Sequence, residues 1–99
     1  MTRDEATEVL AKVCRGEIGL CMANHFWVRV RERAPGFTRQ HVYQLLRKGT
    51  LHGDPWYDEE RGNHKVKVRG TVSDFSRMEI VVAIAWLDDA VCVTIYDKE

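Results

Sequence analysis

The sequence has few cysteines and prolines and no long apolar run. Its three cysteines, Cys14, Cys21 and Cys92, form no Cys-x-x-Cys pair, and each has apolar neighbours. An odd set of this kind argues against a disulfide framework and predicts buried free thiols. No stretch approaches the roughly 18 apolar residues that a membrane span needs, and residues 1–8 lack the apolar segment of a signal peptide. We therefore expect a cytoplasmic protein without membrane contact.

A net charge is also missing, because 15 Lys and Arg residues balance 15 Asp and Glu residues. The overall charge therefore predicts no partner, but its distribution is uneven. Basic residues gather between positions 25 and 48 and again at 65–69, whereas acids gather at 54–60, at 88–89 and at the carboxyl terminus. Such a separation can draw a polyanion to one face of a neutral protein. The alternative is a set of ordinary solvated helix faces.

The length of 99 residues fits one domain, residues 1–99, and its apolar content of 44% is enough for an ordinary core. The first half predicts helices. Thr2 or Asp4 can cap a first helix that ends at Gly16, and a second helix is expected over residues 20–33. Thr38 is a candidate N-cap for a third helix, which Gly49 ends.

The apolar period changes after Gly49. Trp56 and Tyr57 predict a short edge strand after Pro55, and residues 64–69 alternate strictly between apolar and basic. Residues 78–87 are apolar on both faces, as in a central strand, and Asp88-Asp89 predicts a tight turn into a last strand at 91–96. We expect an α+β fold, with two to three helices on one face of a four-stranded antiparallel sheet.

Two clusters of side chains suggest chemistry. In the second helix, His25, Arg29 and Arg33 are spaced four residues apart and share one face. A histidine beside guanidinium groups can transfer a proton near a bound phosphate, which suits cleavage of a phosphodiester. The alternative is a packing or capping histidine, with the arginines paired to Glu32 and to later acids.

The second cluster is a basic ridge on the open sheet face, formed by Lys65, Lys67 and Arg69, with Thr94 and Tyr96 on the last strand nearby. Cations on an open sheet can hold an RNA backbone, and an aromatic ring can stack on an unpaired base. The alternative is an edge strand whose lysines prevent aggregation.

Metal and cofactor motifs give no assignment. Cys21 and His25 stand four residues apart, but no His-Glu-x-x-His motif, glycine-rich phosphate loop or nucleophile elbow is present. We therefore predict no metal and no cofactor.

The run His25-x-x-x-Arg29-x-x-Glu32-Arg33, followed by Phe37-Thr38-x-x-x-Val42 to Gly49, resembles a family of small bacterial domains of unknown function. The strand of residues 91–96 matches the usual ending of that family. The resemblance covers residues 20–97 and leaves the first helix, residues 1–19, outside it. The family is similar to the RelE and BrnT toxins and, more broadly, to barnase-like and colicin-like ribonucleases.

This resemblance implies helices packed on a curved antiparallel sheet, with metal-independent RNA cleavage on the open face. The leading hypothesis is therefore a ribonuclease toxin that a partner antitoxin silences, although relatives of this type are often clearly basic and this chain is neutral. Its expected catalytic residues are His25, Arg29 and Tyr96. Its expected RNA-binding residues are Arg33, Lys65, Lys67, Arg69 and Thr94.

Two alternatives remain open. The first is a non-catalytic module of the same fold that binds a protein or a nucleic acid. The second is a structural or regulatory protein in which His25 and Arg29 lock the helix to the sheet. The neighbours of His25 and Arg29 separate these hypotheses. Burial of both against Tyr96 in a hydrogen-bonded network favours the structural role, whereas an open cleft shared with Lys67 favours the nuclease.

Overall fold

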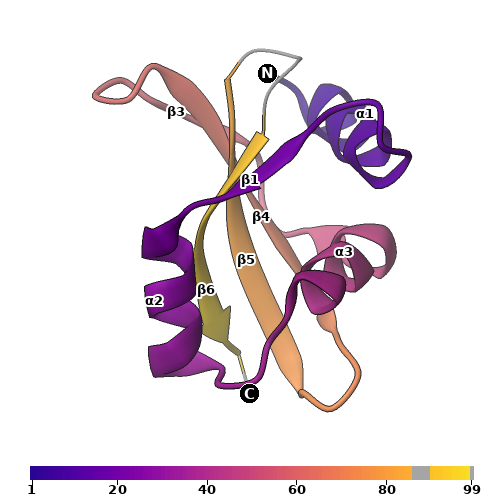
Figure 1. Cartoon of the computed structure of the whole chain (residues 1–99). Coiled ribbons are helices and arrows are strands. Elements are labelled where there is room, and N and C mark those ends of the chain that lie inside the picture. The colour runs from indigo at the N-terminus through magenta and orange to yellow at the C-terminus, as the bar shows by residue number, and fades with distance from the viewer. Residues whose placement is uncertain (86–89, 99) are drawn as a thin grey trace.

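The computed structural model describes residues 1–85 and 90–98, in which three helices and six strands form an α+β fold (Figure 1). In chain order the elements are α1 (Arg3–Cys14), β1 (Leu20–Met22), α2 (Asn24–Arg33), α3 (Arg39–Lys48), β2 (Thr50–Leu51), β3 (Trp56–Asp58), β4 (Asn63–Thr71), β5 (Arg77–Ile84) and β6 (Ala90–Asp97). The predicted α+β class is confirmed. The predicted four-stranded antiparallel sheet is wrong, because the sheet is larger and mixed.

The strands follow the order β1-β6-β5-β4-β2, and β3 pairs with the other end of β4. β1 runs parallel to β6, and the remaining pairs are antiparallel. β5 lies between β4 and β6, as its apolar pattern predicted, and β5 and β6 form the expected antiparallel pair. The turn predicted at residues 88–89 and the last part of the strand predicted at 78–87 lie outside the described residues.

Residues 20–22 correct the predicted start of the second helix. These residues form β1, which pairs with Ala90–Cys92, and α2 begins only at Asn24. The apolar spacing of a three-residue strand is too short to distinguish it from a helical turn. Hydrogen bonding to a strand about 70 positions later in the chain decides the conformation, and local sequence does not contain that information.

The ends of α1 and α3 follow the sequence signals. Thr2 and Glu5 form a capping box, in which each side chain accepts a hydrogen bond from the other residue's backbone N–H. At α3, Thr38 is the N-cap and His41 takes the place of the usual acid, since its Nδ1 accepts the Thr38 N–H at 2.8 Å. α3 then ends directly above β4, where a Cβ on Gly49 would lie 2.6 Å from the Leu45 carbonyl oxygen, so only glycine fits.

The two faces of the sheet have different coverings. The inner face joins the main apolar core, together with apolar side chains of all three helices. Its strand residues include Val66, Val68, Ile80, Val82 and Ile95. α1 and α3 lie on one side of the strands, and α2 lies beside β6, where β1 has already ended (Figure 1). Because side chains alternate along a strand, the opposite, outer face carries the predicted basic ridge.

Among the described residues, no helix is both long enough and apolar enough to cross a membrane.

Candidate nucleic-acid interface

Three rows of paired residues form the outer face of β4, β5 and β6. The rows are Lys65, Ala83 and Val91; Lys67, Val81 and Thr94; and Arg69, Glu79 and Tyr96. Val81 is 6% exposed and Ala83 is 5% exposed, although neither belongs to the main core cluster. On the neighbouring strand β4, Lys65 pairs with Ala83 and Lys67 pairs with Val81. The methylene chains of the two lysines are therefore placed to cover these apolar residues, while the ammonium groups stay near water.

The basic ridge is partly neutralised. The Lys65 ammonium forms an ion pair with the Asp58 carboxylate, and this contact lowers the pKa of Asp58 below its ordinary value. Arg69 binds one oxygen of Glu79 through Nη2 at 2.9 Å and Nε at 3.2 Å. Within the described residues, Lys67 has no acidic partner, and its Nζ lies 5.6 Å from the centre of the Trp56 ring. The ridge is therefore less positive than the sequence indicated.

β4 is not an edge strand. β5 pairs along one side of it, and β2 and β3 pair along the other. The lysines therefore do not protect an exposed edge, and that alternative explanation of the ridge is wrong.

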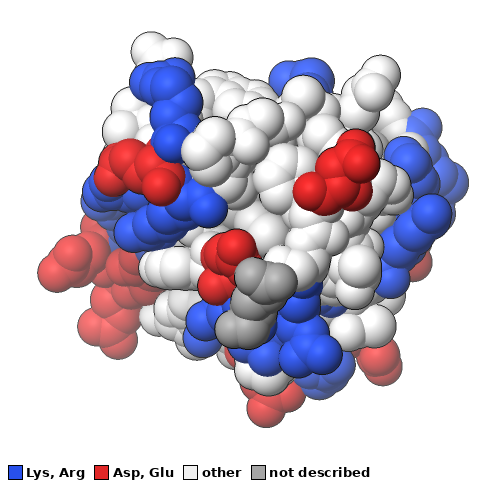
Figure 2. All heavy atoms as spheres, turned by 90° about the horizontal axis from the view of Figure 1, so that it is seen from below, with Lys and Arg blue, Asp and Glu red and all other residues white. Residues whose placement is uncertain are grey.

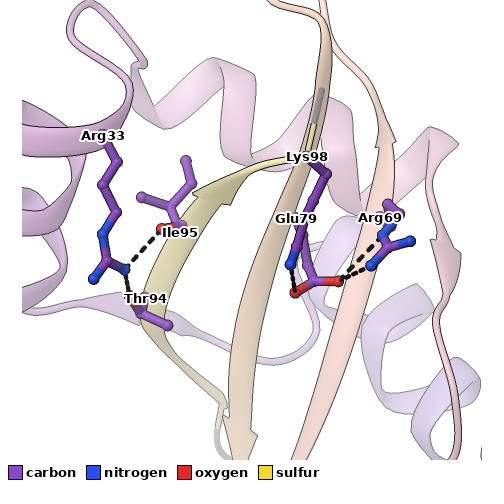
Figure 3. A network of polar contacts seen from close by, with 6 residues as sticks. All are labelled: Arg33, Arg69, Glu79, Thr94, Ile95 and Lys98. Carbon is purple, nitrogen blue, oxygen red and sulfur yellow. Dashed lines mark hydrogen bonds and ion pairs between the residues drawn. The ribbon is translucent and has the colours of Figure 1, made fainter.

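Arg33 joins the end of α2 to the outer face (Figure 3). Its Nη1 donates to Thr94 Oγ1 at 2.9 Å and to the Ile95 carbonyl oxygen at 3.1 Å. The guanidinium carbon lies 4.7 Å from the centre of the Tyr96 ring, which is 37% exposed. Two predicted RNA-binding residues, Arg33 and Thr94, and the predicted catalytic Tyr96 therefore meet at one place.

Glu79 is the acidic centre of the same region. It is 1% exposed and lies between Arg69 and Lys98, whose Nζ is 3.9 Å from Glu79 Oε2 (Figure 3). The Lys98 ammonium also lies 5.2 Å from the centre of the Tyr96 ring. Arg69 and Lys98 thus hold the buried carboxylate, and Arg33 and Lys98 lie against the exposed ring. Glu79 and Lys98 were not predicted, although a lone acid within an apolar strand is a recognisable signal for a buried ion pair.

His25, Arg29 and Arg33 lie on one side of α2, but their side chains make different contacts. Arg29 is paired with Glu32 at 3.0 Å, as the structural alternative proposed. His25 is exposed and has no hydrogen-bond partner in the described part of the chain. Eight residues of helix separate His25 from Arg33, a distance of about 12 Å along the axis. His25 and Tyr96 therefore lie near opposite ends of α2, and the three predicted catalytic residues do not meet.

His25 lines a pocket of about 380 Å³ at the other end of the outer face. The pocket brings His25 together with Lys65 of the predicted ridge and with Arg61 and Asn63, which were not predicted. Ala83 and Val91 contribute apolar walls. The outer face thus holds two separate clusters, one around His25 and one around Tyr96.

Charges of both signs occur around the lower end of the molecule, where Figure 2 shows blue and red groups beside one another with white surface between them. This view shows no continuous positive surface. The charge separation along the sequence is therefore largely cancelled at this end of the fold.

The three cysteines are free, but their environments differ from the prediction. Cys92 is buried and Cys14 is half-buried, whereas Cys21 is exposed because it lies on the short strand β1. Burial raises the pKa of the Cys92 thiol to about 12 and also raises the pKa of Cys14. In residues 1–85 and 90–98, no three His, Cys, Asp or Glu side chains are grouped so that they could bind a metal.

Comparison of the chain with models of protein families, with curated proteins and with solved structures finds no match.

Proposed function

We propose that the outer face binds single-stranded RNA. The observation that carries this proposal is the pairing of exposed aromatic rings with cations on a sheet face. Trp56 is 40% exposed beside Lys67, and Tyr96 is 37% exposed between Arg33 and Lys98. Unpaired bases stack on aromatic rings and on guanidinium planes, while nearby cations attract the phosphates.

The charge of this face favours base stacking as the larger contribution. Asp58 and Glu79 neutralise part of the basic ridge, so few cations are free to bind phosphate. We therefore expect a shallow dependence of affinity on salt, with a slope of about −0.7 for each phosphate contact. Loss of an aromatic ring should have the larger effect.

The test is a fluorescence anisotropy titration with a single-stranded RNA and with the matching duplex. Tyr96→Ala and Trp56→Ala should each weaken binding of the single strand by about 5-fold to 150-fold, since stacking on one base contributes about 1–3 kcal/mol. Tyr57→Ala is the matched control. Tyr57 is 54% exposed, but its ring contacts His64 on the other side of the hairpin. Equal losses for all three variants, or tighter binding of the duplex, would contradict the proposal.

A second candidate is RNA cleavage by a toxin-like ribonuclease, as the RelE-like resemblance of residues 20–97 implies. It is favoured by the exposed His25, which lies in a pocket with Lys65 and Arg61 and is therefore free to transfer a proton. In this proposal Arg29 supports His25, and Tyr96 holds RNA away from the cleaved bond. An antitoxin would silence the protein by covering the outer face, and the reaction would take place in the cytoplasm.

Controlled expression tests the second candidate. Growth arrest and RNA fragmentation by the unchanged chain should be lost in His25→Ala and in Arg29→Ala. His52→Ala is the control, since His52 is exposed and lies outside the pocket. A chain that binds RNA but neither slows growth nor cleaves RNA would be the non-catalytic module.

A further inference from the structure

The pocket beside α2 has the size of a small-molecule site. Its volume of about 380 Å³ falls within the usual range for ligand pockets, roughly 300–1,000 Å³. It lies where the beginning of α2 meets the outer face of β4, β5 and β6. Part of the lining is cationic and part is apolar, so an occupant with an anionic group and a flat apolar body would match both parts.

The cationic part combines the N-terminus of α2 with two side chains. Ala23 is the N-cap residue and provides no side-chain hydrogen bond, whereas Thr2 and Thr38 cap the other two helices. The first N–H groups of α2 are therefore available to an anion, which the helix dipole also favours. His25 and Arg61 line the same pocket, and both are exposed. Neither has an acidic partner among the described residues, whereas Lys65 is held by Asp58.

The lining also includes Asn63, whose side-chain oxygen lacks a donor in the part of the chain that the structure describes. Ala83 and Val91 form a smooth wall, and Asn63 lies beside them in the lining of the pocket. The Asn63 Oδ1 atom is buried and has no hydrogen-bond partner among residues 1–85 and 90–98. A buried acceptor without a donor costs free energy, so a small rotation of the Asn63 side chain that brings this atom to a ligand N–H would be favourable.

From these features we infer that the pocket binds one nucleotide unit of a bound RNA strand. The base lies against Ala83 and Val91, and a base N–H donates to Asn63. The phosphate lies at the N-terminus of α2, where His25 and Arg61 bind it. This inference rests on the proposed binding of RNA and assigns one end of the strand to the pocket, while Tyr96 holds a more distant base.

The experiment uses nuclear magnetic resonance titrations of the full chain with ribonucleoside monophosphates, with the matching nucleosides and with inorganic phosphate. A nucleotide should shift the backbone amide signals of His25, Arg61 and Asn63. Arg61→Ala should weaken nucleotide binding by about tenfold, the effect of one lost charge-assisted hydrogen bond. Arg61→Lys should restore part of the affinity. Arg31→Ala is the matched control, because Arg31 is exposed on α2 but does not line the pocket.

A second variant tests the apolar part. Ala83→Leu should fill the space for the base, so that nucleotide binding falls while inorganic phosphate still shifts the His25 amide. Binding of phosphate as tight as that of every nucleotide would overturn the inference, because it would show an anion site alone. Absence of shifts around the pocket, while the RNA strand still binds through Tyr96, would also overturn it and leave the proposed function standing. Nucleotide binding in the pocket without binding of the strand would contradict only the proposed function.

Discussion

The side chains on the two faces of β5 are shielded from solvent in different ways. Ile80 on the inner face is fully buried in a core that the helices complete. Its neighbour Val81 on the outer face is almost as inaccessible, at 6% exposed, although it lies outside that core. There its paired neighbours are Lys67 of β4 and Thr94 of β6, which are placed to cover it.

This difference shows that burial alone does not identify a core. A face covered by helices is fixed by close packing, whereas a face covered by long charged side chains can open when a ligand displaces them. The outer face can therefore be protected from water in the free protein and still open to the RNA strand that we propose it binds.

The largest effect is expected from truncation of the inner face. Ile80→Ala should lower the free energy of unfolding by about 3–4 kcal/mol, because it leaves a cavity in a closed core. Val81→Ala, one residue away on the other face, should cost about 1 kcal/mol, because flexible side chains can close over the gap. Urea denaturation measures both. Equal losses would show that the outer face is packed as rigidly as the inner one.

The next largest effect concerns the buried carboxylate of the outer face. Arg69→Met should lower the free energy of unfolding by about 2–3 kcal/mol, because Glu79 then stays buried without its close partner. Lys98→Met should cost less than about 1 kcal/mol, since that ammonium is more exposed and more distant. Urea denaturation of the two variants ranks the partners. A larger loss for Lys98→Met would reverse our assignment of the main ion pair.

Much of the fold follows from local signals in the sequence. Thr2 and Thr38 predicted the beginnings of α1 and α3, and the alternation of Val66 and Val68 predicted the inner face of β4. The strand at residues 20–22 could not be predicted, because it is stabilised by pairing with β6 at the far end of the sequence. β2 has two residues, which are too few to show an alternation of apolar and polar side chains.

The site was only partly predictable for a related reason. Alternation placed Lys65, Lys67 and Arg69 on one face, and helical spacing placed His25 and Arg33 in one row. Neither pattern specifies how a helix and a strand are offset, and that offset separates His25 from Tyr96. Ion pairs such as Lys65–Asp58 likewise depend on the register of a hairpin, which the residue types alone do not determine.

Cys92 on the inner face should make the fold less stable at alkaline pH, an effect that we do not expect from the outer face. Burial raises the pKa of Cys92 from an ordinary value of 9.0 to about 12, so the folded protein keeps this thiol protonated. Above about pH 9 the unfolded chain ionises the thiol and is favoured, so stability should fall between about pH 9 and pH 12. The expected slope is at most about 1.4 kcal/mol per pH unit.

Urea denaturation across this pH range checks the slope. Cys92→Ala should remove most of it, and the remainder comes from Cys14, whose pKa burial also raises. Cys21→Ala should retain it, because Cys21 is exposed and pairs with Val91 of the outer-face rows. If both variants kept the same slope, other groups would cause the alkaline loss.

The smallest effect is expected from the ion pair at the edge of the outer face. Asp58→Asn removes the charge that Lys65 binds, yet its side-chain oxygen can still accept the backbone N–H groups of Glu60 and Arg61 that Asp58 Oδ1 accepts now. The turn is thus preserved and the variant isolates the ion pair. Because Lys65 lowers the pKa of Asp58, the pair stabilises the fold above the ordinary pKa of 3.8. That contribution is lost as the pH falls through the lower folded value.

The matched variant is Asp58→Ala, which removes both the ion pair and the hydrogen bonds of the turn. Urea denaturation at neutral pH should show a small loss for Asp58→Asn that added salt reduces, because the pair lies close to solvent. Asp58→Ala should show a larger loss that salt leaves largely unchanged, because backbone hydrogen bonds are little screened. Equal losses for the two variants would mean that the ion pair, and not the turn, holds Arg61 and Asn63 in place beside the pocket. In that case a change of charge at Asp58 would alter the positions of Arg61 and Asn63 in the proposed nucleotide site.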